Sequence, residues 1–130
     1  MHQRRKAREV TLQVLYELDV QEIDVREAIE RFWANFDAPE ETKQFSSFLI
    51  EGVWSKREQI DKLISGNSEN WTMARMSRVD KSILRMAVYE LLFCHDIPPK
   101  VTLNEAIDLG KVYGSENSGA FINGILDALY

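Results

Sequence analysis

The stretch from Ser77 to His95 restricts the possible fold more than any other part of this 130-residue chain. A helix over these residues would be apolar around most of its circumference, and such a helix must be enclosed by others on nearly all sides. Its apolar residues are Val79, Ile83, Leu84, Met86, Ala87, Val88, Leu91, Leu92 and Phe93. We therefore predict a central helix surrounded by the rest of a helical domain.

Capping signals define the ends of this central helix. Ser77 is a suitable N-cap, and Asp80 can reach back to the free amides of the first turn, where a carboxylate also meets the positive end of the helix dipole. Pro98 and Pro99 prevent the helix from continuing. The central helix should thus end near His95.

Apolar residues at helical spacing predict further helices along the whole chain. The expected helices run from His2 to about Leu18, from Asp24 to about Asp37, from Pro39 to about Ser65, from Thr102 to Gly114, and onward from the polar link over Ser115 to Ser118. The Thr102 helix would begin with a T-x-x-E capping box. Gly52 and Gly124 are expected to permit close helix crossings, and Trp71 is expected to pack on the core from a short helical turn.

The fold class follows from the absence of sustained period-two alternation. We predict an all-α protein of about seven helices. Residues 1–130 form one domain in this interpretation, because no composition break marks a linker. The lone Cys94 cannot form an intrachain disulfide, and no stretch has the length and apolarity of a membrane span or signal peptide. We expect a cytoplasmic protein with no membrane association.

The usual signatures of enzymes and metal sites are missing from the sequence. Neither a nucleotide-binding glycine loop nor a zinc-protease or serine-hydrolase motif occurs. The two histidines, His2 and His95, lie far apart, and His95 and Cys94 diverge by about 100° on a helix. We therefore expect a protein without catalytic residues, bound metal or cofactor.

An N-terminal basic arm contrasts with the acidic remainder of the chain. Residues 1–8 contain Arg4, Arg5, Lys6 and Arg8 and no acidic residue, whereas the rest of the chain holds 12 basic and 21 acidic residues. Basic side chains that neutralise phosphates release counterions, so such an arm suits nucleic acid even though the net charge is −5. On charge alone, a solvated helix start is the simpler interpretation.

Four runs of sequence resemble the NusB family of transcription antitermination factors. Three lie between residues 78 and 127, namely RVDKSILRMAVYEL, IPPKVTLNEAIDLGKVYG and SGAFINGILD. The fourth is RRKARE followed by LQVLY, near the N-terminus. The resemblance covers both ends and the core of the chain in the family's order, and only residues 19–76 are nondescript.

This resemblance implies a fold of two packed three-helix subdomains and a non-enzymatic role in bacterial transcription. NusB-like proteins bind the boxA element of nascent RNA, usually together with NusE, a ribosomal protein of the small subunit. The pair helps load further factors onto the transcription elongation complex, notably in ribosomal RNA operons. Some members self-associate, so the sequence leaves monomer and homodimer both open.

Carried over position by position, the resemblance implies two sets of contacts. The implied RNA contacts are Arg4, Arg5, Lys6, Arg8, Gln13, Tyr16, Asn117, Ser118 and Phe121. The implied NusE-facing edge consists of Tyr16 and the start of the central helix, including Asp80. Without the resemblance, Phe121 would be assigned to core packing with Ile125, and at position 117 this chain has Asn where the family often has an acid.

The chemistry of these residues agrees with RNA binding, because single strands are held by cations along phosphates and by bases on aromatic or guanidinium planes. Two other classes stay open. One is the RNA-binding front domain of an RNA cytosine methyltransferase, although the chain has no cofactor-binding strand and glycine loop. The other is a helical adaptor between proteins, with a merely solvated arm.

Overall fold

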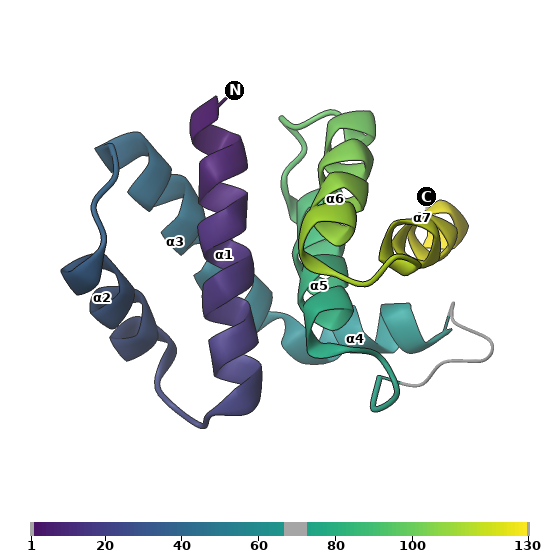
Figure 1. The fold of residues 1–130 in the computed structure, drawn as a ribbon, viewed down its shortest axis with the longest axis horizontal. Coiled ribbons are helices and arrows are strands. Elements are labelled where there is room, and N and C mark those ends of the chain that lie inside the picture. Colours follow the sequence, from purple (N-terminus) through teal and green to yellow (C-terminus); the bar gives the residue numbers. More distant parts are fainter. Residues whose placement is uncertain (1, 67–72, 130) are drawn as a thin grey trace.

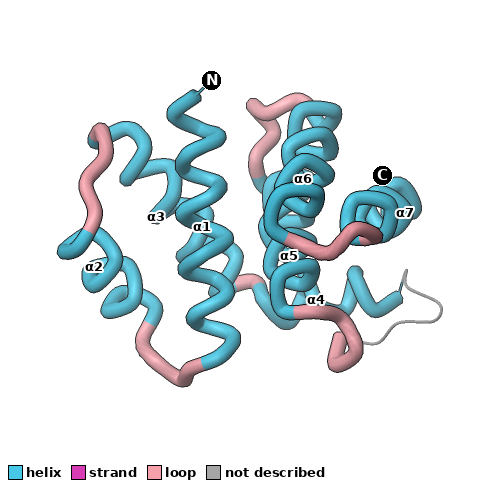
Figure 2. Tube along the Cα trace, in the orientation of Figure 1, coloured by secondary structure: helices cyan, strands magenta, loops and turns pink. Residues whose placement is uncertain are grey.

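Seven helices form the part of the chain that the structure describes, residues 2–66 and 73–129 of a computed structural model, with side chains described from Arg4 (Figure 1). They are α1 (His2–Val20), α2 (Val25–Asn35), α3 (Glu40–Ser55), α4 (Arg57–Gly66), α5 (Arg78–Phe93), α6 (Pro99–Tyr113) and α7 (Ser118–Leu129). No strand occurs among the described residues (Figure 2). The all-α prediction is confirmed. None of the described helices could cross a lipid bilayer, since none is both long and apolar enough.

The helices form two groups of three that pack together through α1 and α5. Helices α1, α2 and α3 contact one another, as do α5, α6 and α7 (Figure 1). Helix α4 connects the groups and contacts α3, α5 and α7. The predicted pair of three-helix subdomains is therefore confirmed. Helix α1 lies at the junction of the two groups and contacts helices of both.

Helix α5 is enclosed as its sequence predicts. Every residue from Ser82 to Glu90 is buried, including Ile83 and Leu84 with no exposed surface. Ser77 caps the helix, and its Oγ accepts a hydrogen bond of 3.0 Å from the Asp80 N–H. The last turn of α5 is less buried, and its Phe93 side chain is 37% exposed. The enclosed part of α5 is the core against which both groups pack.

The prediction of a single helix from Pro39 to Ser65 is wrong, because the helix is interrupted at Lys56, between α3 and α4. The hydroxyl of Ser55 donates a 3.0 Å hydrogen bond to the Gly52 carbonyl, which the Lys56 N–H also contacts. Such local side-chain bonds compete with the helical ladder and help it to end. The break allows α4 to turn away from α3 and contact α5 and α7.

The prediction that a T-x-x-E capping box at Thr102 begins the next helix is also wrong. Helix α6 begins at Pro99 rather than Thr102, because Pro98 holds extended backbone and a proline is tolerated in the first helical position. The Thr102 hydroxyl is buried and donates a 2.9 Å hydrogen bond to the Glu90 carboxylate instead. The Glu105 side chain is thereby available for the basic residues of α1.

Two glycines predicted to permit close helix crossings differ in their surroundings. At Gly52, a Cβ atom would overlap the ring of Tyr89 on α5, so the close crossing is confirmed. At Gly124 nothing lies within 4 Å of such an atom, so that part of the prediction is wrong. The close approach near α7 occurs at Gly110 of α6, where a Cβ would meet Ile122 at 2.7 Å.

Replacement of Gly52 by Ala is expected to destabilise the protein by about 1–3 kcal/mol, because the Tyr89 ring would have to move within a packed core. Urea unfolding followed by circular dichroism would measure the effect. Gly124→Ala is the matched control, and it should stabilise the protein by up to about 1 kcal/mol through helix propensity alone. Equal effects of the two substitutions would contradict the close crossing.

The predicted connection over residues 66–76 is described only in part. Met73 is partly buried and packs against the core, as expected. The predicted packing of Trp71 falls outside the described residues.

Candidate nucleic-acid interface

The basic arm forms the first turns of α1, and its exposed cations lie beside acids of the second helix group. The Arg4 guanidinium is 3.6 Å from Asp96, and that of Arg5 is 3.1 Å from Glu105 and 3.4 Å from Asp108. The hydrogen bond to Glu105 raises the pKa of Arg5. Exposed pairs of this kind contribute little to stability. Both arginines can therefore exchange an acid for a phosphate at small cost.

Lys6 differs from the arginines of the arm. Its side chain is exposed and has no ion-pair partner among the described residues. Arg4 is held over the ring of Phe45, with 4.6 Å from its Cζ atom to the ring centroid. Lys6 is therefore the cation of the arm that can contact an anion without breaking an existing pair.

Arg8 corrects the expectation that all four basic residues are available to RNA. Its side chain is only 4% exposed and makes two hydrogen bonds of 2.8 Å to the carboxylate of Glu90, one from Nε and one from a terminal nitrogen. Thr102 donates a third bond to the same carboxylate at 2.9 Å. Buried charges persist only when they are paired and hydrogen-bonded. Arg8 thus holds α1 against α5 and α6 and does not face solvent.

A second candidate region lies at the link between α6 and α7. Asn117 is exposed, and Phe121 is partly buried against the core. Both line a hollow of about 200 Å³ together with Asp80. The remaining lining residues are Met76, Ser77 and Ser115. The structure therefore brings together the predicted RNA residues of the link and the start of α5.

Ser118 requires a correction of the same kind as Arg8. It is 1% exposed, and its Oγ accepts a 2.9 Å hydrogen bond from the Ser115 N–H. Its hydroxyl also lies 3.3 Å from that of Ser115. These contacts fix the turn that leads into α7 and leave the hydroxyl unavailable to a ligand. Ser118 therefore positions Asn117, and its own side chain is buried within the protein.

Asp80 and Tyr16, the two predicted partner-binding residues, line different hollows. Asp80 is 9% exposed, and its Oδ1 atom is buried with no hydrogen-bond partner among the described residues. Tyr16 is 43% exposed on α1, beside Val79 rather than Asp80. Val79 and Asp80 are neighbours on α5, and their side chains lie on different sides of the helix because neighbouring helix positions diverge by about 100°.

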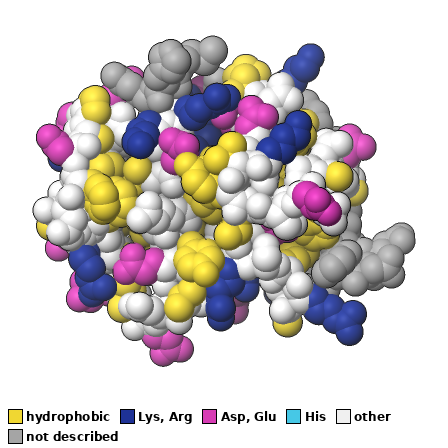
Figure 3. Space-filling view, viewed as in Figure 1, with side chains coloured by type: hydrophobic (Ala, Val, Ile, Leu, Met, Phe, Trp, Pro, Cys, Tyr) yellow, Lys and Arg dark blue, Asp and Glu magenta, His cyan; other side chains and the backbone are white. Residues whose placement is uncertain are grey.

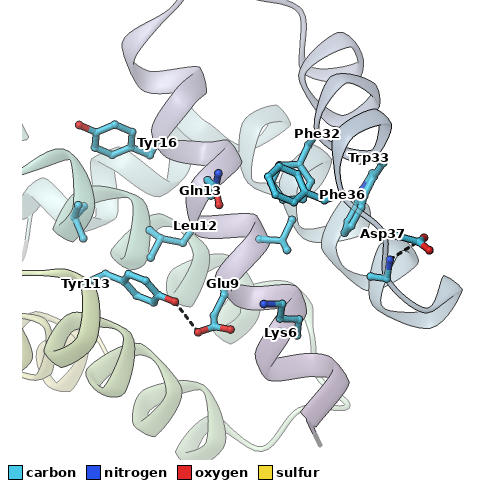
Figure 4. A pocket seen from close by; sticks show the side chains of 13 residues that line it. Lys6, Glu9, Leu12, Gln13, Tyr16, Phe32, Trp33, Phe36, Asp37 and Tyr113 are labelled. Atoms are coloured by element: carbon cyan, nitrogen blue, oxygen red, sulfur yellow. Dashed lines mark hydrogen bonds between the residues drawn. The ribbon is translucent and has the colours of Figure 1, made fainter.

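The larger hollow follows the exposed side of α1 and has a volume of about 470 Å³ (Figure 4). Gln13 lies on the ridge of α1, with the aromatic residues of α2 on one side and Tyr113 of α6 on the other. Tyr113 donates a 2.7 Å hydrogen bond to Glu9, and this bond raises the pKa of the Tyr113 hydroxyl. The lining residues are Lys6, Glu9, Val10, Leu12, Gln13, Tyr16, Phe32, Trp33, Phe36, Asp37, Ala38, Val79 and Tyr113.

The charge on this face is mixed. Basic and acidic side chains are interspersed over it rather than separated into two regions (Figure 3). Within residues 2–66 and 73–129, no group of three or more His, Cys, Asp or Glu side chains could hold a metal ion.

The sequence did not reveal which acids oppose the arm. Glu105 and Asp108 are ordinary polar positions of a helix in the sequence, and they meet Arg5 only because α1 and α6 lie side by side. For Glu90 the sequence does predict a partner, because a charged side chain within a buried apolar run must be paired with an opposite charge. This prediction does not say which of the 16 basic residues is the partner.

Comparison with known proteins matches this chain to one family over nearly its whole length. The model of the NusB family matches residues 5–130. The transcription antitermination protein NusB of Syntrophus aciditrophicus is 71% identical over all of this chain and 81% of its own length. The NusB protein of Desulfatibacillum aliphaticivorans is 47% identical over all of this chain and 91% of its own length.

Solved structures agree with these relatives. NusB of T. maritima has a TM-score of 0.88 at 39% identity, covering 95% of this chain and 87% of its own. A crystal structure of the antitermination factors NusB and NusE in complex with double-stranded RNA has a TM-score of 0.89 at 27% identity, covering 100% and 97%. With its family-model match, its sequence relatives and its seven-helix fold in agreement, this chain belongs to the NusB family.

Proposed function

We propose that this protein is an RNA-binding transcription antitermination factor that acts together with NusE on boxA-type single-stranded RNA. The observation that carries the proposal is its family membership, since its relatives are transcription antitermination proteins and a structural neighbour was solved with NusE and double-stranded RNA. The exposed cations at the start of α1 provide the charge that such binding needs.

Within this proposal, RNA contacts the exposed arm and the α6–α7 link. Arg4, Arg5 and Lys6 bind phosphates, and Gln13 and Tyr16 continue the surface along α1. Asn117 and Phe121 contact RNA at the link, where an amide in place of an acid removes a charge that would repel phosphates. These assignments are supported by exposure of the arm and by the hollow that Asn117 and Phe121 share.

The NusE-facing edge is proposed to include Tyr16 and Asp80. Tyr16 offers an exposed ring, and the buried Asp80 Oδ1 is an acceptor without a protein partner, which a donor from NusE would satisfy. Because Asp80 shares its hollow with Asn117 and Phe121, RNA and NusE would meet at this position. The complex would then join the transcription elongation complex in the cytoplasm.

The protein is proposed to act by binding and not by catalysis. Its one cysteine is buried, and desolvation raises the pKa of the Cys94 thiol to about 11, which keeps the thiol protonated and a poor nucleophile. The described histidine, His95, has no metal-binding cluster around it. Neither Cys94 nor His95 is therefore suited to nucleophilic or metal-assisted chemistry.

Titration of a labelled boxA-type single strand, with and without NusE, tests the proposal. We expect NusE to increase the affinity for the single strand. A duplex of the same sequence should compete poorly with that strand for the protein. Asp80→Ala, which removes the acceptor, should remove most of the tightening by NusE and should not weaken the binding of RNA alone. Sedimentation of the free protein would establish beforehand whether it is a monomer or a homodimer. Absence of RNA binding in both conditions would refute the proposal.

A further inference from the structure

The groove between α1 and α2 has an aromatic wall that the proposed RNA contacts do not use. The rings of Phe32 and Phe36 stack with 4.6 Å between centroids, and Trp33 meets Phe32 edge-on at 4.9 Å. Phe36 remains 55% exposed, the most among the described phenylalanines. A stacked pair with one open ring face is a platform on which another flat group can stack.

The opposite wall of the groove comes from α1 and carries two exposed polar side chains, Lys6 and Gln13. Lys6 and Gln13 lie along α1 beside the aromatic residues of α2 (Figure 4), and neither has a hydrogen-bond or ion-pair partner among the described residues. They are seven residues apart, or about 10 Å along the helix, and lie on the same face of it. The groove therefore offers a free cation and a free amide beside an aromatic platform.

The two acids that line the hollow are already engaged. Asp37 lies 3.3 Å from Lys43 and accepts a 2.9 Å hydrogen bond from the Ala38 N–H, and the contact with Lys43 lowers the pKa of Asp37. Glu9 accepts the bond from Tyr113 on the other side of α1. Neither carboxylate therefore pairs with Lys6, whose charge stays available to an anion.

We propose that this groove binds one unpaired base of the RNA strand, with the base stacked on Phe36, its edge on Gln13 and an adjacent phosphate on Lys6. The inference rests on the proposed function and adds a base-binding site to it. A flat face, a hydrogen-bonding edge and an attached anion are together the properties of a nucleotide. A Gln amide can donate one hydrogen bond and accept another at the same time, and among the bases this pattern matches the edge of adenine best. The hollow of about 470 Å³ to which the groove belongs extends over both sides of α1.

An apolar side chain of a protein partner is the main rival occupant. It would cover Phe36 but would leave the Lys6 ammonium and the Gln13 amide without a role. The free cation therefore favours RNA.

The test uses the full chain with Trp54 and Trp71 changed to Phe, so that Trp33 is the only tryptophan. Titration with a boxA-type single strand is expected to quench Trp33 fluorescence with the same midpoint as anisotropy of the labelled RNA. Phe36→Ala should weaken binding about tenfold, as expected for loss of one stacking aromatic residue. In strands with one base removed at a time, a single position should cause a similar loss in the parent protein and none in Phe36→Ala.

Phe48→Ala is the matched control, because Phe48 is 48% exposed on α3 and does not line the groove. It should leave the affinity unchanged. Gln13→Ala, which removes only exposed polar atoms, should weaken binding several-fold even if Phe36→Ala proves unstable by circular dichroism.

Three results would overturn the inference. Salt-dependent RNA binding that is unaffected by Phe36→Ala and Gln13→Ala, with Trp33 fluorescence unchanged, would refute the base site and leave the proposed function standing. Weakened NusE binding with unchanged RNA affinity in Phe36→Ala would assign the groove to a protein. Absence of RNA binding by the folded parent protein, with and without NusE, would refute both.

Discussion

Glu90→Gln is expected to destabilise the protein by about 3–5 kcal/mol, the cost of leaving a buried charge without its partner. Glu90 is 2% exposed and is the carboxylate to which Arg8 donates twice. The substitution removes the negative charge but keeps the shape, so Arg8 would stay buried with only the more distant Glu105, at 3.9 Å, to compensate it. A domain of ordinary stability would lose a large fraction of its free energy of unfolding.

Urea unfolding of a double-mutant cycle would measure this coupling. Arg8→Met should also destabilise strongly, because it leaves the Glu90 carboxylate unpaired. The double variant Arg8→Met, Glu90→Met should recover much of the loss, since replacing both members of a buried pair by apolar residues is often nearly neutral.

An exposed ion pair provides the control. Arg26 lies 3.4 Å from Glu51, with side chains 77% and 46% exposed, so Arg26→Ala should cost less than about 1 kcal/mol. If Glu90→Gln cost no more than Arg26→Ala, the buried pair would not be what holds α1 against α5.

The second large effect is expected for RNA binding when Arg4, Arg5 and Lys6 are all changed to Ala. If each cation neutralises one phosphate, the slope of log affinity against log salt should fall by about 0.7 per residue, or about 2 in all, as for single strands. At low salt this corresponds to a loss of about tenfold or more. Fluorescence anisotropy at several salt concentrations would measure both the affinity and the slope.

Arg8 is left unchanged in this variant, because its removal would destabilise the fold and confuse the two effects. A charge-matched control replaces Arg26, Arg31 and Lys62, three exposed residues outside the arm, by Ala. That control should keep the parent slope. Equal slopes for the arm variant and the parent would remove the arm from the RNA interface.

The fold was accessible from the sequence where a local pattern has one physical solution. An apolar circumference over residues 77–95 can be satisfied only by enclosure, and Ser77 has one role at a helix start, so α5 was predicted nearly to the residue. The break at Lys56 and the start of α6 at Pro99 were missed because several weak local preferences compete there. The hydrogen bond of Ser55 and the fit of Thr102 to Glu90 decided the outcome.

The candidate site divides in the same way. The chain itself determined that it carries a basic arm, an aromatic second helix, and a polar link before the last helix, because these are properties of residue types and their spacing. Tertiary structure alone decided that Arg8 is buried on Glu90 and Lys6 is free. It also decided that Asp80 lies with Phe121 rather than with Tyr16. The physical reason is that burial and pairing depend on which residues of distant helices meet, and helical periodicity gives the direction of a side chain but not its neighbour.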